Sequence, residues 1–513
     1  MVAAMDSIPL VAPVVATLPG HVRTLVVGAG FGGLGMAIKL EENGDRDFLV
    51  VEKGHDVGGT WRDNTYPGAA CDVPSQLYSF SFARNPQWSR SFSPQEEIYA
   101  YLRRVAVASG VLDRFVFDTT MEHATWDETE SVWRVETSRG ELTADVLVTA
   151  SGGLSEPRLP DIDGIDSFEG EVFHSARWNH DFDLTGKRVA LIGTGASAIQ
   201  IIPEIAAKVA HLDVYQRTAP WVMPRHDRAY GALERFGFKH VPGMQRLYRT
   251  AIYWARETFV PGFTVSTKLA APAKMAALNN IAKGIDDPAL RERVTPQFEI
   301  GCKRILISND YYPALARDDV DLVTDRIAKL TASSVVTTDG TEREVDAVIV
   351  ATGFYTVDQP IAHRITGRDG QTLAAGWARD GMAAYKGTTV HGFPNLFQIV
   401  GPNTGLGHSS MVFVIESQIA YILETLRGMR EHDLATVEPT EQAQRSWNAD
   451  LQRRLARTVW NTGGCESWYL DEHGRNTTLW PRTTFVLRKL LAAFDKEKYH
   501  VTSRRTAGAT PGA

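Results

Sequence analysis

The chain has 513 residues, of which 54 are Lys or Arg and 61 are Asp or Glu, so its formal net charge is −7. At about 150 residues per domain, this length predicts about three domains, or two of which one is interrupted. The acidic balance argues against a nucleic-acid binder, which usually carries a basic surface. Because no apolar run approaches the ~20 residues that span a bilayer, we expect no membrane segment and a cytoplasmic protein.

Three cysteines, Cys71, Cys302 and Cys465, lie far apart and form no CxxC pair. This spacing argues against a disulfide framework, a thiolate zinc site and a dithiol redox motif. We therefore expect three free thiols in a reducing cytoplasm, and no metal, because no HExxH-like spacing is present. Residues 8–20 predict an extended arm, and residues 502–513 predict a disordered tail.

The first ordered segment predicts a strand, a glycine-rich turn, a helix and a second strand. A β-rich apolar run leads into a GxGxxG turn, and after a helical stretch the second strand, residues 48–51, ends at Glu52. The glycines of the turn are Gly28, Gly30 and Gly33. They allow a tight turn and the close approach of a pyrophosphate to the helix N-terminus. With strands, helix and acid in place, the segment predicts a dinucleotide-binding unit.

A second copy of this pattern begins at residue 188. A strand, residues 189–192, precedes a turn made of Gly193, Thr194, Gly195, Ala196, Ser197 and Ala198. A helix towards Val209 and a strand over 212–215 follow.

The residue that follows the second strand of each unit indicates which nucleotide the unit binds. Glu52 follows Gly28 by 24 residues, and Arg217 follows Gly193 by the same 24. An acid at this position suits a ribose 2′-hydroxyl, whereas an arginine suits a 2′-phosphate. The first unit therefore predicts FAD and the second predicts NADPH.

Residues 144–152 and 345–353 repeat one strand pattern, and each follows a run of alternating strand-like segments. We therefore predict an α/β fold with two Rossmann-like dinucleotide-binding domains. Residues 221–299 break the α/β alternation and predict an all-helical insertion in the NADPH domain. The predicted division is an FAD-binding domain over 1–155 and 390–513, an NADPH-binding domain over 156–220 and 300–389, and the insertion over 221–299. A strand at 396–400, a glycine-rich loop at 401–407 and a helix at 409–426 would aim a helix N-terminus at the flavin.

Two motifs carry a family resemblance. Residues 58–72, GGTWRDNTYPGAACD, fit the Baeyer–Villiger monooxygenase pattern (A/G)GxWxxxx(F/Y)P(G/M)xxxD at every position. Residues 168–179, FEGEVFHSARWN, fit the second fingerprint, FxGxxxHxxxW(P/D), at Phe168, Gly170, His174 and Trp178, and depart from it at Asn179. The chain therefore resembles this family from residue 23 to about residue 490. Trp178 favours it over the N- and S-oxygenating flavin monooxygenases.

The resemblance implies which residues bind the cofactors. Those implied for FAD, besides the glycines of the first turn and Gly59, are Glu52, Thr60, Trp61, Asp72, Tyr78 and the backbone at Met121. Those implied for NADPH are Thr194, Gly195, Ala196, Ser197, Gln200, Arg217, Thr218 and Lys303. Ser467-Trp468-Tyr469 resembles the carboxy-terminal segment whose tryptophan, here Trp468, covers the nicotinamide nucleotide.

The implied reaction uses O2 and NADPH to insert one oxygen atom beside the carbonyl of a small-molecule ketone, through a peroxide formed on the reduced flavin. Because peroxide and adduct are anionic, a fixed cation is needed beside the flavin. Arg304 resembles the active-site arginine of the family, and Asp72 is the carboxylate expected to orient it. The alternatives are an N- or S-oxygenating flavin monooxygenase, a flavin reductase that passes electrons to a protein partner, and a non-catalytic dinucleotide sensor.

Overall fold

The computed structural model describes residues 18–504. Most of the predicted arm and tail therefore lies outside the described residues. Within them, Thr502 and Ser503 belong to the last strand, β20 (Tyr499–Ser503), which pairs with β19 (Leu434–Pro439).

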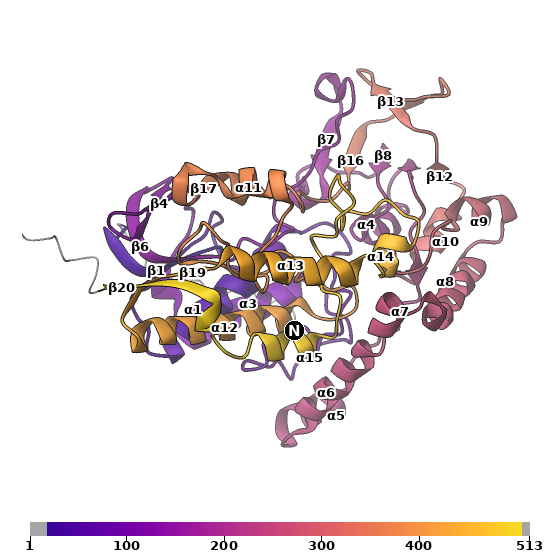
Figure 1. Ribbon diagram of the computed structural model, residues 1–513. Coiled ribbons are helices and arrows are strands. Elements are labelled where there is room, and N and C mark those ends of the chain that lie inside the picture. Colours follow the sequence, from indigo (N-terminus) through magenta and orange to yellow (C-terminus); the bar gives the residue numbers. More distant parts are fainter. Residues whose placement is uncertain (1–17, 505–513) are drawn as a thin grey trace, which may run out of the picture.

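The first sheet has eight strands and contains the first nucleotide unit (Figure 1). Its order is β17-β4-β5-β6-β1-β2-β3, with β18 paired to β6. The strands are β1 (His21–Val27), β2 (Phe48–Val51), β3 (Phe115–Val116), β4 (Met121–Asp127), β5 (Val132–Thr137), β6 (Gly140–Thr149), β17 (Ile365–Thr366) and β18 (Leu396–Gln398). β1 runs parallel to β2 and to β6, as expected when α1 (Phe31–Glu42) forms the crossover. The predicted division places the return of the chain to this domain at residue 390. In the structure the chain already returns to this sheet at β17, which pairs with β4.

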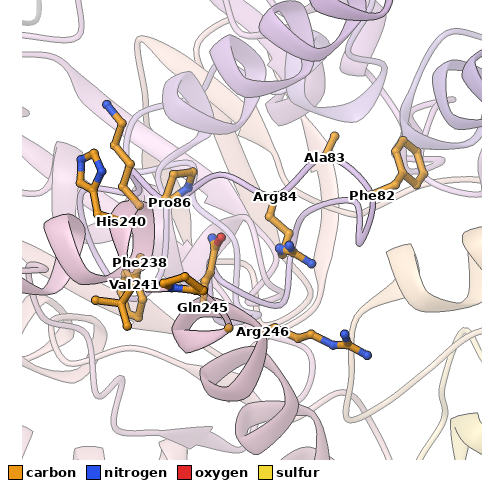
Figure 2. A pocket seen from close by; sticks show the side chains of 12 residues that line it. Phe82, Ala83, Arg84, Pro86, Phe238, His240, Val241, Gln245 and Arg246 are labelled. Atoms are coloured by element: carbon orange, nitrogen blue, oxygen red, sulfur yellow. The ribbon is translucent and has the colours of Figure 1, made fainter.

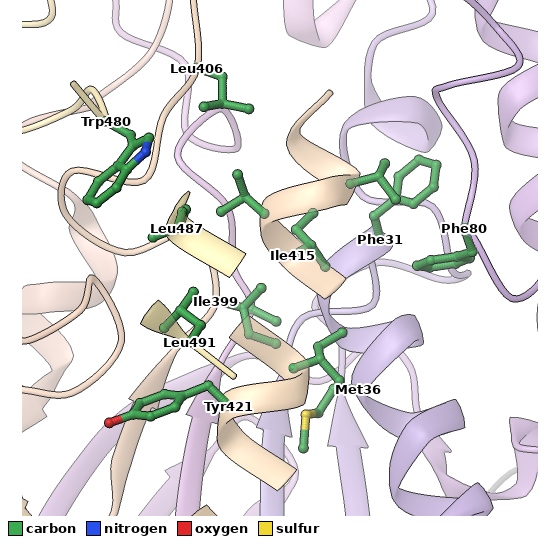
Figure 3. Packing of buried hydrophobic residues seen from close by; sticks show 14 of the residues in the cluster. Phe31, Met36, Phe80, Ile399, Leu406, Ile415, Tyr421, Trp480, Leu487 and Leu491 are labelled. Carbon is green, nitrogen blue, oxygen red and sulfur yellow. The ribbon is translucent and has the colours of Figure 1, made fainter. Parts of the chain in front are cut away.

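The core of this unit joins α1 to α12 (Met411–Glu431), which come from opposite ends of the sequence (Figure 3). Leu34 and Met36 of α1 are fully buried, and Ile415 and Tyr421 of α12 are buried with them. Each such side chain contributes roughly 1.5–3 kcal/mol when it leaves water. This packing fixes the chain that precedes α12 against the first nucleotide turn.

The second sheet is all parallel, in the order β12-β9-β8-β16-β7. Its strands are β7 (Glu171–His174), β8 (Arg188–Ile192), β9 (His211–Tyr215), β12 (Val320–Val323) and β16 (Ala347–Val350). α4 (Ala198–Ile205) is the crossover after β8, and it ends before Val209, the predicted limit. A small antiparallel sheet follows β12, made of β13 (Ile327–Leu330), β14 (Ser334–Thr337) and β15 (Glu342–Glu344).

The insertion is largely helical, and its first two helices extend away from the body of the molecule (Figure 1). Its helices are α5 (Ala232–His240), α6 (Met244–Glu257), α7 (Val260–Thr264), α8 (Ala271–Gly284) and α9 (Pro288–Val294). The all-helical prediction is wrong at its start, where β10 (Val222–Met223) pairs with β11 (Leu306–Ile307). This pairing satisfies backbone groups where the insertion leaves and rejoins the domain.

The remaining helices are short, apart from α3 and α13. They are α2 (Thr60–Asp63), α3 (Gln95–Ser109), α10 (Tyr311–Leu315), α11 (Leu373–Asp380), α13 (Glu441–Leu455), α14 (Val459–Thr462) and α15 (Thr484–Leu490). Between residues 18 and 504, no helix is both long enough and apolar enough to cross a membrane. The predicted α/β class, with two Rossmann-like units and a helical insertion, is confirmed.

The cysteine prediction is wrong for two of the three residues. Cys302 and Cys465 form a disulfide with a Cα–Cα distance of 6.1 Å, and Cys71 is a buried free thiol. The bridge joins residues 163 positions apart, so it depends on tertiary packing that no local spacing reveals.

Candidate functional site

The two glycine-rich turns begin with a glycine in a similar backbone conformation. Gly28 and Gly193 adopt φ values of 105° and 116°. A Cβ at Gly28 would lie 2.7 Å from the Ala150 carbonyl oxygen, and one at Gly193 would lie 2.6 Å from that of Ala351. Only glycine fits such positions, which leave backbone N–H groups open to a pyrophosphate at the start of α1 and α4. Both turns therefore fit a dinucleotide.

Glu52 directly follows β2 beside the first turn and is only 5% exposed. Its carboxylate accepts hydrogen bonds from the backbone N–H groups of Ala29 (2.7 Å) and Gly54 (2.8 Å). Arg62, which sequence analysis missed, lies 3.0 Å from the same carboxylate. The Glu52 carbonyl also accepts from Thr119 N–H, two residues before Met121. These contacts hold an acid where the ribose of FAD is predicted.

The motif between residues 58 and 78 folds into a compact aromatic corner. Gly59 precedes α2, which carries Thr60 and Trp61. The Trp61 indole N–H donates to the Tyr78 hydroxyl at 3.0 Å, and the two rings meet edge to face at 5.5 Å. Burial raises the pKa of Tyr78, so its hydroxyl stays protonated. The structure therefore brings these predicted FAD residues together.

Gln200 links the two nucleotide units. It lies on α4 of the second unit, and its amide oxygen accepts from the Tyr66 hydroxyl at 3.0 Å. Its amide nitrogen donates to the Ala70 carbonyl at 3.0 Å. Tyr66 and Ala70 both belong to the motif of the first unit, so this amide fixes one turn against the other.

The predicted 2′-phosphate site contains two cations. Arg217 and Thr218 follow β9 and are exposed, and the Thr194 hydroxyl donates to the Thr218 carbonyl at 3.3 Å. Burial, and then the like charge of Arg217, lowers the pKa of Lys303. Within the described chain, neither cation forms an ion pair with a carboxylate within 4.0 Å. Two neighbouring cations, of which neither has a carboxylate within ion-pair distance in the described chain, fit a phosphate.

Arg304 and Asp72 form a bidentate ion pair, although they lie 232 residues apart. The guanidinium donates from Nε at 2.8 Å and from Nη2 at 2.7 Å to the two carboxylate oxygens. Burial would raise the pKa of Asp72, but the charge and hydrogen bonds of Arg304 outweigh it and lower the pKa. Asp72 in turn raises the pKa of Arg304. Both groups are therefore charged.

Three neighbours of this pair were not predicted. Arg304 Nη1 donates to the Leu406 carbonyl at 3.5 Å, in the loop that precedes α12. Burial raises the pKa of Tyr469 to about 12, and its ring lies close enough to interact with Arg304. Burial also lowers the pKa of Arg256 on α6, whose positive charge acts on Asp72. The sequence patterns include Tyr469 and the loop that holds Leu406, but they mark none of the three contacts with the pair, because each residue reaches it through tertiary packing.

The second fingerprint lies where the chain passes between the two units. His174 ends β7 opposite Val350, and Pro157 forms an isolated bridge with Phe354 nearby. His174 Nδ1 accepts from Ala176 N–H at 3.0 Å, and burial lowers the pKa of His174 to about 4. Trp178 packs edge to face on Phe173 with ring centroids 5.0 Å apart.

The other fingerprint positions have structural contacts. Phe168 is buried in the second unit, and a Cβ on Gly170 would lie 2.5 Å from the Asp346 carbonyl oxygen. The Asn179 amide donates to Glu171 at 2.7 Å. The fingerprint therefore packs the passage between the units and places no side chain on the Arg304–Asp72 pair.

Trp468 is 46% exposed and lies beside Tyr469, with ring centroids 4.5 Å apart. A separate cavity of about 470 Å³ lies between residues 82–86 and the α5–α6 hairpin (Figure 2). Its lining includes Phe82, Phe238 and Gln245 but none of the predicted site residues. The candidate site is therefore the region of the two turns and the Arg304–Asp72 pair.

Comparisons with known proteins identify the family. Residues 25–232 match the model of the pyridine nucleotide-disulphide oxidoreductase family. A Baeyer–Villiger monooxygenase of Streptomyces coelicolor is 51% identical over 96% of this chain and 95% of its own. A Baeyer–Villiger monooxygenase of Pseudomonas aeruginosa is 49% identical over 94% of this chain and 92% of its own.

Solved structures agree over nearly the whole chain. Cyclohexanone monooxygenase from Rhodococcus sp. Phi1, bound to NADP+, has a TM-score of 0.84 at 29% identity and covers 95% of this chain and 100% of its own. OTEMO in complex with FAD and NADP has a TM-score of 0.84 at 28% identity, covering 94% and 99%. With two nucleotide turns that fit these cofactors, the chain belongs to the Baeyer–Villiger monooxygenases, which are enzymes that depend on FAD and NADPH.

Proposed function

We propose that this enzyme inserts one oxygen atom of O2 beside the carbonyl of an organic ketone, giving an ester or a lactone, and that Arg304 is its essential cation. The observation that carries the proposal is the bidentate Arg304–Asp72 pair. Bound FAD, once reduced by NADPH, supplies the activation of O2.

The role of Arg304 follows from its charge and geometry. Its pKa is raised by Asp72, so it stays charged and moves no proton during the reaction. Two of its nitrogens are held by Asp72, and Nη1 makes only a 3.5 Å contact with the Leu406 carbonyl. Nη1 is therefore the donor that we assign to the negative charge that develops at the substrate oxygen. A preorganised donor of this kind needs no rearrangement when charge develops.

Asp72 has a positioning role. Its two oxygens match the planar fork of the guanidinium, which a lysine ammonium would not do. Because Asp72 belongs to the motif over 58–72 and Arg304 to the second unit, the pair also aligns the two cofactor sites. Gln200 supports the same alignment through Tyr66 and Ala70.

On the NADPH side, we assign Arg217 and Lys303 to the 2′-phosphate. On the FAD side, we assign Glu52 to a ribose hydroxyl, to which its carboxylate can add a hydrogen bond beside those from Ala29 and Gly54. The alternatives from sequence, an N- or S-oxygenating monooxygenase and a flavin reductase, are not favoured by the relatives.

Arg304 variants test the proposal. Removing one preorganised donor to an oxyanion typically costs about 10²- to 10³-fold in rate, so Arg304→Ala should retain FAD but form almost no ester. Arg304→Lys keeps the charge but loses the planar fork, so its rate of ester formation should lie between those of the unmodified enzyme and Arg304→Ala. Asp72→Asn should show a milder loss, because it leaves the guanidinium charged but poorly oriented.

The measurement is ester formation per bound FAD, with flavin absorbance and circular dichroism as controls for folding. Arg326→Ala, at an exposed position of the second unit, is the matched control and should behave as the unmodified enzyme. Ester formation by Arg304→Ala at the rate of this control would contradict the assigned role.

A further inference from the structure

The Cys302–Cys465 disulfide joins two segments that carry predicted site residues. Cys302 directly precedes Lys303 and Arg304. Cys465 lies three residues before Trp468. The bridge therefore ties the segment predicted to cover the nicotinamide nucleotide to the segment that supplies Lys303 and Arg304.

The chain just before Cys465 packs directly against the chain just before Cys302. The Gly463 carbonyl accepts from Glu299 N–H at 3.0 Å. A Cβ on Gly463 would lie 2.7 Å from the Cβ of Cys302 and 2.9 Å from its sulfur. Glycine at this position thus allows the approach of the two backbones that the bridge requires.

Beyond Gly463 the segment has few other ties. In the described chain, residues 464–468 form only two hydrogen bonds, and both are local. Tyr469 N–H donates to the Ser467 hydroxyl, and Leu470 N–H donates to the Ser467 carbonyl. Glu466 and Trp468 are exposed. Gly463 and buried Tyr469 flank these residues, and between them the disulfide is the covalent tie to the segment that carries Lys303, aided by the attraction between Glu466 and Lys303.

We propose that Cys302–Cys465 is a reversible thiol–disulfide site that small dithiols open and hydrogen peroxide closes, and that the closed form binds the nicotinamide nucleotide more tightly. This inference rests on the proposed NADPH site at Arg217 and Lys303. Because Cys302 is 1% exposed and Cys465 is partly exposed, the reagents attack at Cys465.

The chemistry balances in both directions. On opening, a dithiol thiolate attacks the Cys465 sulfur, forms a mixed disulfide with it and releases the Cys302 thiolate. The second thiolate of the reagent then attacks the reagent's own sulfur, closes a cyclic disulfide and releases the Cys465 thiolate, so that two electrons and two protons pass to the protein cysteines. On closing, the Cys465 thiol and H2O2 give a sulfenic acid and water, and the Cys302 thiol displaces a second water to form the bridge.

Opening weakens binding because residues 464–468 must then be ordered by the nucleotide. If the open segment adopts the binding conformation for a tenth to a third of the time, the apparent Kd rises about 3- to 10-fold. FAD binding should not change, because the bridge touches none of the residues assigned to FAD.

The test uses the FAD-loaded enzyme purified without reductant. Maleimide labelling of the denatured protein should find one thiol before dithiothreitol treatment, at Cys71, and three after it. The Kd of NADP+, measured by calorimetric titration, should rise about 3- to 10-fold on reduction and return after hydrogen peroxide. Cys465→Ser and Cys465→Ala should match the reduced enzyme and ignore both reagents, whereas Cys71→Ser should keep the response.

Three labelled thiols before reduction would overturn the site, and an equal Kd for the two forms would overturn its effect on binding. Both readings come from the unmodified chain and need no variant to fold. If neither form binds NADP+, the assignment of the NADPH site fails, and this inference fails with it.

Discussion

At the scale of single residues, the Arg304–Asp72 pair decides which chemistry the site can support. Asp72 has a lowered pKa, so the pair is intact above the ordinary carboxyl range near pH 4 and weakens only as pH falls through the lowered pKa. Loss of oxygenation between pH 6 and pH 9 is therefore not due to this pair. Sequence motifs could predict both residues, and the family resemblance implied that Asp72 orients Arg304. No local pattern could show the bidentate geometry of the pair, because its members lie 232 residues apart.

Arg217 should determine the preference for NADPH over NADH. A charge-assisted hydrogen bond is worth roughly 1.5–3 kcal/mol, so Arg217→Ala should raise KM for NADPH about 10- to 100-fold and leave NADH almost unchanged. Lys303 lies close enough to reduce the loss. Steady-state kinetics with both nucleotides give the result. Equal effects on the two nucleotides would remove the 2′-phosphate assignment.

At the scale of elements, the β-strand–turn–helix units could be predicted closely, because their glycines and apolar runs are local signals. β2 has the predicted bounds of residues 48–51. The differences arise where tertiary packing decides. α12 continues past residue 426 to Glu431 along the first core, and the start of the insertion is a strand because β11 pairs with it.

Buried His174 should make the stability of the second unit depend on pH. Its folded pKa is about 4 against an ordinary 6.5, so between these values the unfolded chain binds a proton that the folded chain does not. Stability is therefore lost as pH falls from 6.5 towards 4, by about 2 kcal/mol between pH 7 and pH 5.

His174→Asn should remove this dependence, because an amide oxygen can still accept the Ala176 N–H but does not titrate. Urea unfolding at pH 7 and pH 5 compares the variant with the unmodified enzyme. His500→Asn, at an exposed position of β20, is the control and should keep the full dependence. An unchanged loss of stability in His174→Asn would show that other groups cause it.

At the scale of the whole molecule, the two nucleotide units meet through Gln200, Arg304 and the disulfide. The sequence could predict the two units and their cofactors from repeated local patterns. It could not predict the disulfide, since Cys302 and Cys465 meet only after α14 and the Gly463 turn pack on the NADPH unit. The domain boundaries stay a prediction. β17 lies before the predicted boundary at residue 390 and is already paired in the first sheet.

The most direct test of the account follows the oxygen atom. The FAD-loaded enzyme is incubated with NADPH, cyclohexanone and ¹⁸O2, and the products are analysed by mass spectrometry, with a thioether in a parallel reaction. The account predicts a lactone that carries one ¹⁸O atom and forms in proportion to the NADPH consumed. NADPH consumption without labelled lactone across cyclic, linear and aryl ketones, or labelled sulfoxide as the sole oxygenated product, would contradict it.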